Sequence, residues 1–516
     1  MAFVQALLSN PAIPAKDRQK ALDRAFADPG LPSTNPTSSF WLRSPHTDLA
    51  KVQSATLPSE ADVVIIGSGV TGTSIARTLL KSRKAKKSQS DSQRPAVVIL
   101  EARDICSGAT GRNGGHILET AEEFADLEDK HGPDAAKKIM RFRLAHLREM
   151  LDTAEEYGLT KECQARRVQF LSVYFDEDGW EDARERVRRL KVGLPEETKE
   201  WRVYERGEIP EEFCLSRALG IVAGPGGAIW PYRFVTGVLD QLKKEFSRDL
   251  LIETNTPVTG IEEVDGGGDS HLRYLVSTSR GVIRARHVIH CTNAHVGHLV
   301  PGLRGRIYPI RGQMSAQHPG QKFRCQGEEH SWILNYDRGF DYLTQLPQSE
   351  AGQMMMFGGG FAQGEGGGIA DMGIATDSEI SLYADIHLSG ALSAVFGRNN
   401  WGSVAQQSVE QMWTGNMGFS ADGLPWVGRL PGSTTEREPH REGQGAEWVS
   451  AAFSGEGMVL AWLCGKALAT MLLIHDNELL ESKSTDLSWF PEQMLVTEDR
   501  VKKAVLMRHV QERSHL

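Results

Sequence analysis

Residues 61–80, with the sequence ADVVIIGSGVTGTSIARTLL, constrain the fold more than any other stretch of the chain. The apolar run at residues 63–66 is rich in β-branched side chains, which favours a strand buried on both faces. The glycine-rich sequence GSGVTG follows at residues 67–72, and a helical pattern of apolar residues comes next. Strand, glycine-rich turn and helix in this order are typical of a dinucleotide-binding unit. A purely structural turn is the alternative.

The three glycines of this turn have separate expected roles. Gly67 allows the tight turn, Gly69 lets the backbone approach a pyrophosphate, and Gly72 lets the helix pack closely on the strand. A second apolar strand ends in Glu101, whose carboxylate can accept hydrogen bonds from ribose hydroxyls. The separation between Gly72 and Glu101 exceeds the ~20 residues usual for such a unit. This excess predicts a polar, solvated insertion at residues 81–94.

Length and composition are those of a globular protein. The chain has 516 residues, of which 40% are hydrophobic and 24% are charged, enough for about two or three domains. The net charge of −9 argues against nucleic acid as a partner. The six cysteines have neither CxxC nor Cys/His metal spacing, so we expect free thiols and no metal site.

The two ends of the chain carry different expectations. The N-terminus lacks the basic region and hydrophobic core of a secretion signal, and no apolar run reaches the ~18 residues of a membrane span. The chain ends in Ser514, His515 and Leu516, which resembles the small–basic–Leu class of addresses read by the peroxisomal import receptor. We therefore expect a peroxisomal protein, with a cytoplasmic protein and an ordinary tail as the alternative.

Several motifs occur in a fixed order along the chain. They are GSGVTG at 67–72, Glu101, GATGRNGG at 108–115, HCTNAH at 290–295, PIRGQM at 309–314, WTGNMGFSADGLPWVG at 413–428 and FSGEGM at 453–458. Together they resemble the FAD-dependent amine and amino-acid oxidoreductases of the D-amino-acid oxidase superfamily, near the glycine and sarcosine oxidases. The loop GATGRNGGH most resembles the γ-glutamylputrescine oxidoreductase branch.

The resemblance implies an α/β (α+β) two-domain fold. A Rossmann-like FAD-binding domain would be interleaved with a substrate domain built on an antiparallel β-sheet, which the alternating pattern of residues 304–359 also predicts. The implied division is an N-terminal arm at 1–57, FAD-binding segments at 58–160, 226–303 and 409–480, substrate-domain segments at 161–225 and 304–408, and a tail at 481–516.

The resemblance also implies the cofactor and its contacts. FAD would be non-covalent, because the cysteine that attaches flavin in some relatives has no counterpart at residues 413–415. The glycine turn would hold the pyrophosphate, Glu101 the ribose and the Val258 backbone the adenine. The residues expected around FAD are Gly67, Ser68, Gly69, Val70, Thr71, Gly72, Glu101, Ala102, Arg103, Gly108, Ala109, Thr110, Gly111, Arg112, Asn113, Gly114, Gly115, Val258, Thr292, Asn293, Ala294, Asp422, Gly423, Pro425, Gly455, Glu456, Gly457 and Met458.

The family reaction passes hydride from the carbon next to an amine to the flavin, and water hydrolyses the imine. Candidate catalytic residues are Arg112, His116, Arg311, Arg338, Tyr342, Trp413 and Glu456. Arg311 or Arg338 could clamp a carboxylate, or form surface ion pairs instead. Tyr342 and Trp413 could equally be core aromatics. A carboxylate near flavin N1 would oppose reduction, so we assign Glu456 to the substrate side.

The expected function is oxidation of a C–N bond in a small amine or amino acid, with O2 as the acceptor and H2O2 as a product. A dehydrogenase that passes electrons to another carrier would have the same motifs, as would a non-catalytic protein that keeps FAD as a structural ligand. The amine itself is not predicted, because specificity would lie in the β-rich wall, where motif matches are few.

Overall fold

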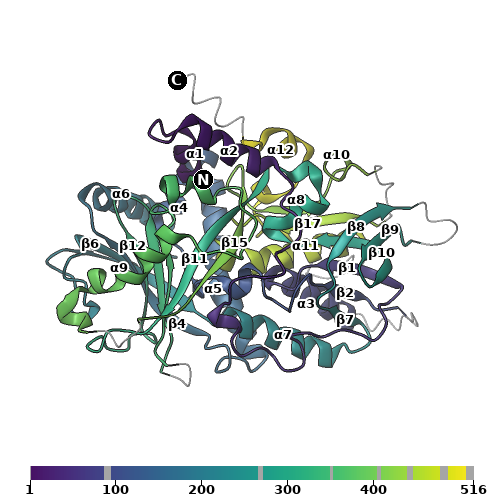
Figure 1. The fold of residues 1–516 in the computed structure, drawn as a ribbon, viewed down its shortest axis with the longest axis horizontal. Coiled ribbons are helices and arrows are strands. Elements are labelled where there is room, and N and C mark those ends of the chain that lie inside the picture. Colours follow the sequence, from purple (N-terminus) through teal and green to yellow (C-terminus); the bar gives the residue numbers. More distant parts are fainter. Residues whose placement is uncertain are drawn as a thin grey trace.

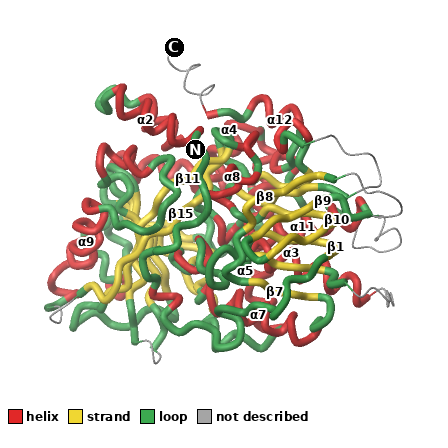
Figure 2. Tube along the Cα trace, turned by 45° about the vertical axis from the view of Figure 1, so that its right-hand side comes forward, coloured by secondary structure: helices red, strands yellow, loops and turns green. Residues whose placement is uncertain are grey.

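The computed structural model describes residues 2–85, 94–264, 271–348, 352–403, 408–437, 445–476 and 486–506. In this part of the chain two β-sheets lie side by side with helices around them (Figures 1 and 2). No helix among the described residues is both long and apolar enough to cross a membrane. Most of the expected insertion at 81–94 and all of residues 514–516 lie outside the described residues, so the peroxisomal address stays a prediction.

The first sheet has eight strands and is centred on β1 (Glu60–Ile66), which covers the apolar run before the glycine turn. β1 pairs in parallel with β2 (Val97–Leu100) and with β10 (Gly281–His290). All residues of β2 are buried, as expected for a parallel strand covered on both faces. The strand order is β16-β17-β10-β1-β2-β7, and a β8–β9 ribbon pairs with β10. These further strands are β7 (Leu250–Glu253), β8 (Val258–Glu263), β9 (Tyr274–Thr278), β16 (Trp426–Arg429) and β17 (Glu447–Ala451).

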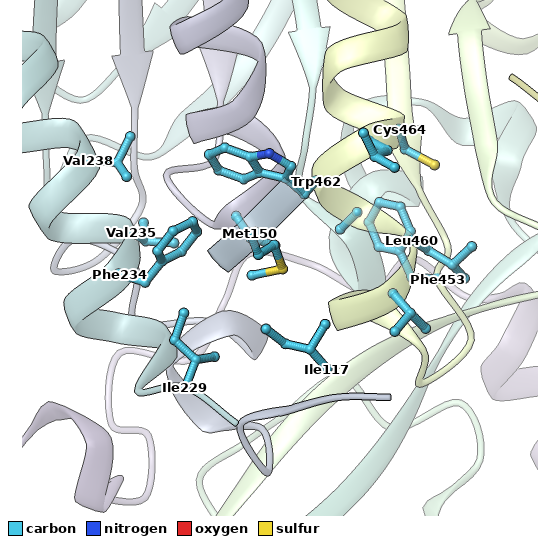
Figure 3. Packing of buried hydrophobic residues seen from close by; sticks show 14 of the residues in the cluster. Ile117, Met150, Ile229, Phe234, Val235, Val238, Phe453, Leu460, Trp462 and Cys464 are labelled. Carbon is cyan, nitrogen blue, oxygen red and sulfur yellow. The ribbon is translucent and has the colours of Figure 1, made fainter. Parts of the chain in front are cut away.

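Two helices pack closely beside this sheet. α3 (Val70–Ala85) begins directly after the glycine-rich turn, and α11 (Ala461–His475) is the long apolar helix near the end of the chain. Gly465 of α11 permits the close approach, because a Cβ there would lie 2.8 Å from the backbone oxygen of Thr71. Figure 3 shows the apolar cluster around Trp462 of α11, which includes Ile117, Met150, Phe234, Val235 and Val238.

The second sheet has nine strands, in the order β15-β11-β14-β13-β12-β4-β6-β3 with β5 paired to β6. All of these pairs are antiparallel except β12 with β4, so the antiparallel sheet predicted for the substrate domain is confirmed. The strands are β3 (His116–Ile117), β4 (Arg166–Tyr174), β5 (Arg202–Glu205), β6 (Gly220–Ala228), β11 (Ile307–Gln317), β12 (His330–Asn335), β13 (Phe340–Gln345), β14 (Met355–Gly359) and β15 (Val409–Ser420).

Two strands lie in a different sheet from the one that the expected domain boundaries imply. β15 pairs with β11 along its length, although the segment 409–480 was expected in the FAD-binding domain. β3 pairs with β6, although it falls inside the expected FAD-binding segment 58–160. Hydrophobic alternation predicts that a segment is a strand, but not which sheet it joins, because pairing depends on partners distant in the sequence.

The remaining helices lie around and between the two sheets, and α1 and α2 belong to the N-terminal arm (Figure 1). They are α1 (Ala2–Ser9), α2 (Ala15–Phe26), α4 (Ala121–His131), α5 (Pro133–Glu156), α6 (Glu177–Gly193), α7 (Pro231–Glu245), α8 (Val296–Leu299), α9 (Leu382–Trp401), α10 (Gly432–Thr435) and α12 (Glu498–Lys503). The arm packs on the body of the molecule: Phe40 and Trp41 are buried, and the Trp41 indole N–H donates to the carbonyl oxygen of Asn113.

Candidate cofactor and substrate site

A cavity of about 710 Å³ runs between the two sheets. Its volume lies within the range of roughly 300–1,000 Å³ typical of ligand and cofactor sites. Its walls include the glycine turn, the loop at 108–116, strands β11, β13 and β15, and the loop at 453–458. The cavity therefore joins the nucleotide motif of one sheet to the antiparallel wall of the other.

The glycine turn fits a pyrophosphate. Gly67 has φ +114°, and a Cβ there would lie 2.7 Å from the backbone oxygen of Cys291. A Cβ on Gly72 would lie 2.1 Å from the oxygen of Gly67, so this glycine serves helix–strand packing and does not itself line the cavity. The N-terminus of α3 opens onto the cavity at Val70 and Thr71, where a helix dipole and backbone N–H groups favour an anion.

Glu101 lies in the cavity wall at the end of β2, as expected for a ribose contact. Its carboxylate accepts hydrogen bonds from the Ser68 backbone N–H at 3.1 Å, the Ser68 hydroxyl at 2.6 Å and the Arg103 backbone N–H at 3.1 Å. A carboxylate has about four acceptor positions, so these bonds fix its orientation and leave capacity for a ribose hydroxyl. The donors present at this end of the cavity therefore fit a dinucleotide.

Most of the residues expected around FAD line this cavity, and six of them do not. Those along its wall are Gly67, Ser68, Gly69, Val70, Thr71, Glu101, Ala102, Arg103, Gly108, Ala109, Thr110, Arg112, Asn113, Gly114, Val258, Thr292, Asn293, Ala294, Gly455, Glu456, Gly457 and Met458. Those away from it are Gly72, Gly111, Gly115, Asp422, Gly423 and Pro425. The Arg500 guanidinium holds this last loop, donating to Asp422 at 2.8 Å and to the Pro425 carbonyl at 2.8 Å.

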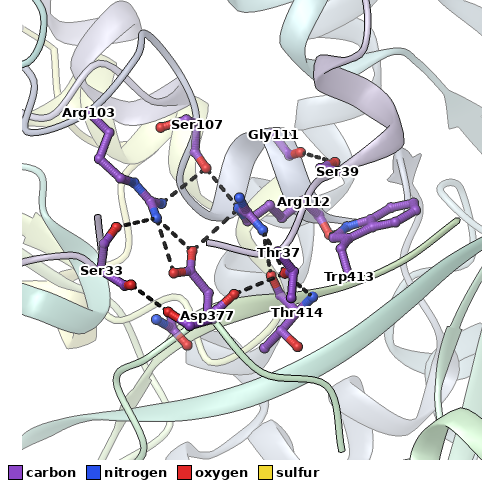
Figure 4. A network of polar contacts seen from close by, with 12 residues as sticks. Ser33, Thr37, Ser39, Arg103, Ser107, Gly111, Arg112, Asp377, Trp413 and Thr414 are labelled. Atoms are coloured by element: carbon purple, nitrogen blue, oxygen red, sulfur yellow. Dashed lines mark hydrogen bonds and ion pairs between the residues drawn. The ribbon is translucent and has the colours of Figure 1, made fainter. Parts of the chain in front are cut away.

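Arg112 is held by the protein itself (Figure 4). Its guanidinium donates to the carbonyl oxygens of Ser107 and Thr414, each at 2.8 Å, and lies 3.4 Å from the carboxylate of Asp377. Asp377 also binds Arg103 at 2.9 Å. Burial lowers the pKa of Arg112 to about 10, and the charge of Asp377 opposes this shift. Arg112 thus lines the cavity with its guanidinium held in a fixed orientation, and its contact with a substrate stays a prediction.

Two other candidate arginines do not line the cavity. Arg311 pairs with Asp371 at 2.6 Å and does not line the cavity, although its neighbours Ile310 and Gly312 do. Arg338 is exposed in the turn between β12 and β13. The sequence predicted that these arginines belong to the correct wall, but not which way their side chains point.

Of the aromatic candidates, some line the cavity and one does not. Trp413 is fully buried outside the cavity, and its indole N–H donates to the Arg112 carbonyl at 2.9 Å, so it is the core aromatic of the two alternatives. Tyr342 and His116 both line the cavity, with ring centroids 5.8 Å apart. A Cβ on Gly114 would lie 2.8 Å from the Tyr342 ring, so Gly114 allows this approach.

His116 is half-buried, and both of its ring nitrogens are buried without a hydrogen-bond partner among the described residues. Burial, reinforced by the charge of Arg166, lowers the pKa of His116 to about 3. The imidazole is therefore neutral at physiological pH. It presents one nitrogen that can accept and one that can donate a hydrogen bond to a molecule in the cavity.

Glu456 belongs to an ionic cluster that the sequence did not predict. It lies 3.4 Å from Arg143 of α5, and Arg143 makes a closer, two-bond contact with the buried Glu119. The pKa of Glu456 is raised, first by burial and then by Glu123, while Arg143 opposes the shift. The Glu456 side chain lines the cavity and is 41% accessible, so a molecule bound in the cavity can reach its carboxylate.

Further wall residues were also missed by sequence reasoning. Glu123 and Asp126 of α4 line the cavity, and so do Gly30, Leu31 and Pro32 of the N-terminal arm. No local pattern distinguishes such residues from a solvated surface.

The fold and the cavity together define a dinucleotide-binding protein with a second, antiparallel substrate wall. Residues 62–471 match the sequence model of the DAO family, described as FAD dependent oxidoreductase. The chain therefore belongs to this family, and its cofactor is FAD. The α/β fold, the family resemblance and the FAD expected from the sequence are confirmed.

Two relatives and two solved structures illustrate the similarity. A probable oxidoreductase, OrdL, of Rhizobium meliloti is 24% identical over 84% of this chain and 87% of its own. The gamma-glutamylputrescine oxidoreductase of Escherichia coli is 23% identical over 80% and 83%. Glycine oxidase from Geobacillus kaustophilus superposes with a TM-score of 0.56, at 18% identity over 85% of this chain and 99% of its own. L-proline dehydrogenase from P. horikoshii gives 0.57 at 19% identity over 85% and 97%.

Proposed function

We propose that this protein oxidises a C–N bond in a small amine or amino acid and passes the electrons to O2. The names of similar proteins support this class: a gamma-glutamylputrescine oxidoreductase, a glycine oxidase and an iminodiacetate oxidase. The substrate would lose two electrons and two hydrogens to give an imine, which water converts to a carbonyl compound and an amine or ammonia. O2 would take up the two electrons and two protons as H2O2.

The observation that carries the proposal is the continuity of the cavity from Glu101 to Tyr342. FAD supplies the hydride acceptor when bound. The glycine turn would hold its pyrophosphate and Glu101 its ribose, with Asn113 and Gly114 beside the ring. A substrate on the Tyr342 side would then meet a wall with a neutral His116, which can accept a hydrogen bond from an amine N–H.

The test is an absorbance spectrum of the purified protein before and after anaerobic addition of amines and amino acids. We expect a flavin band that acid releases from the protein, because no covalent attachment is predicted. Loss of the band with one compound, restored by air with one H2O2 per turnover, is the expected result. A protein that binds no FAD would overturn the proposal. A protein that binds FAD that no amine reduces would also overturn it and would favour a non-catalytic flavoprotein.

A dehydrogenase is the second candidate, and the similarity to an L-proline dehydrogenase favours it. The same experiment separates the two. In a dehydrogenase, an amine would reduce the flavin and air would leave it reduced. An added artificial electron acceptor would reoxidise it.

A further inference from the structure

The charged side chains that line the cavity are unevenly distributed. Among the described residues, the carboxylates of the lining are Glu101, Glu123, Asp126, Asp377 and Glu456, and its lysine and arginine residues are Arg103 and Arg112. The acceptor positions of Glu101 are largely used by Ser68 and Arg103, as shown above. Negative charge without a matching cation is therefore concentrated where α4 and the loop at 453–458 meet the cavity.

The two lining arginines share a single carboxylate, that of Asp377, and most of their N–H donors are used within the protein. Arg103 donates to the two carboxylate oxygens of Asp377 at 2.9 and 3.1 Å, and Arg112 lies 3.4 Å from the same carboxylate (Figure 4). Their other donors reach backbone oxygens, including those of Ser107 and Thr414. A substrate carboxylate would have to displace these bonds, because bidentate binding needs two parallel N–H donors on one guanidinium.

The opposite end keeps an excess of negative charge. The charge of Arg143 is matched by the buried Glu119, which takes two of its donors, so Glu456 receives only the longer 3.4 Å contact. Glu123 has no hydrogen-bond or ion-pair partner in the described part of the chain. Asp126 is paired with Arg186 at 2.7 Å. Glu119, Glu123 and Glu456 thus share one cation, Arg143, and this leaves an excess of two negative charges.

The neutral polar groups of this wall can also bind an amine. The ring nitrogens of His116 are buried and unpartnered among the described residues, and an amine N–H could satisfy one of them. The phenol ring of Tyr342 lies against His116 and within the electrostatic influence of Glu456. A cation bound between these groups would supply the positive charge that the wall lacks, since a carboxylate partly withdrawn from water is stabilised by a cation beside it.

We propose that the substrate is a diamine or polyamine, with one amino group oxidised and the other held as an ammonium ion by Glu456 and Glu123. This inference rests on the proposed function and narrows it. The site does not require a substrate carboxylate, in contrast to the bidentate clamp by Arg311 or Arg338 that the sequence suggested.

The experiment measures anaerobic flavin reduction by three matched sets of compounds. They are α,ω-diaminoalkanes of three to six carbons, n-alkylamines of the same lengths, and amino acids such as glycine, sarcosine and proline. We expect one diamine to reduce the flavin at a concentration about 10- to 100-fold lower than its monoamine partner, the range of one charge-assisted contact. The KM of that diamine should rise with salt, because ions screen the attraction.

Glutamine variants then test which carboxylates bind the second ammonium group of the diamine. Glu456→Gln and Glu123→Gln should each raise the KM of the diamine about tenfold or more, with a smaller change for the monoamine. Glu181→Gln, an exposed carboxylate of α6, is the charge-matched control and should leave both KM values unchanged. If Glu456→Gln does not fold, Glu123→Gln and the salt dependence of the wild type still decide the question.

The outcomes separate this inference from the proposed function. Flavin reduction by an amino acid at lower concentration than any diamine would overturn the diamine assignment and leave amine oxidation standing. If Glu456→Gln and Glu123→Gln had the same KM for the diamine as the control Glu181→Gln, Glu456 and Glu123 would not be the residues that bind the ammonium group. Flavin that no compound reduces would overturn the proposed function and this inference together.

Discussion

Gly67 shows how a single residue can be required both by the backbone and by the cofactor. Its φ of +114° is costly for any residue with a side chain, and a Cβ there would meet the backbone oxygen of Cys291 at 2.7 Å. Cys291 follows β10, the strand beside β1, so neither partner can move without disturbing the central sheet. The tight turn expected at Gly67 is therefore enforced by a neighbouring strand.

We expect Gly67→Ala to weaken FAD binding at least tenfold and to lower the free energy of unfolding by about 1–3 kcal/mol, the usual cost of local backbone strain. The matched control is Gly207→Ala, because a Cβ at Gly207 meets nothing within 4 Å. Flavin titration of the apoprotein and urea unfolding measure the two effects. Equal FAD affinity in the two variants would show that the close contact with Cys291 is not needed.

At the scale of elements, a buried histidine joins two helices. His146 of α5 donates from Nδ1 to the Phe142 carbonyl at 2.9 Å and accepts at Nε2 from the Leu463 backbone N–H at 3.1 Å. Leu463 lies in the first turn of α11, where backbone N–H groups have no partner within the helix. The neutral imidazole is thus part of the cap of α11, and protonation of Nε2 would remove that bond.

This cap predicts a pH dependence of stability. Burial lowers the pKa of His146 to about 4, from about 6.5 in the unfolded chain. Below pH 6.5 the unfolded state binds a proton that the folded state excludes, so stability is highest above pH 6.5 and falls as the pH drops toward 4. The loss between pH 8 and pH 5 should be about 2 kcal/mol from this residue.

Urea unfolding of the FAD-bound protein at pH 8 and pH 5 tests this prediction. His146→Ala should be less stable at pH 8 and should lose less stability on acidification than the wild type. His271→Ala, a substitution at an exposed position, should keep the pH dependence of the wild type. If acidification destabilised His146→Ala as much as the wild type, the pH dependence would have to come from other groups.

At the scale of the whole molecule, sequence patterns predicted the structural features that depend on residues close together in the sequence. The strand, turn and helix at residues 61–80, the end of β2 at Glu101 and the order of the family motifs all appear as expected, because each depends on residues close in sequence. The parallel pairing of β4 with β12 joins segments more than 150 residues apart, and no local pattern specifies it. The directions of Arg311 and Arg338, and the approach of Glu123 to Glu456, depend on such long-range pairing in the same way.

The position of the N-terminal arm depends most clearly on contacts between residues that are distant in the sequence. Gly30, Leu31 and Pro32 line the cavity although they lie outside the residues matched by the family model. The arm is fastened through Thr37, whose hydroxyl donates to the Asp377 carbonyl at 2.9 Å and accepts from the Thr414 backbone N–H at 2.9 Å. The arm therefore closes one side of the cavity.

We expect Thr37→Val to loosen this closure and to raise the dissociation rate of FAD about tenfold, because the buried N–H of Thr414 loses its partner at a cost of about 1–3 kcal/mol. Ser38→Ala is the matched control, since the Ser38 side chain is exposed at the next position of the arm. The rate at which flavin is released after dilution, together with protease cleavage within the arm, measures the effect. An arm that becomes sensitive to protease while FAD leaves at the wild-type rate would mean that the arm covers the cavity without retaining the cofactor. Faster release in Thr37→Val alone would make the arm a functional part of the FAD site.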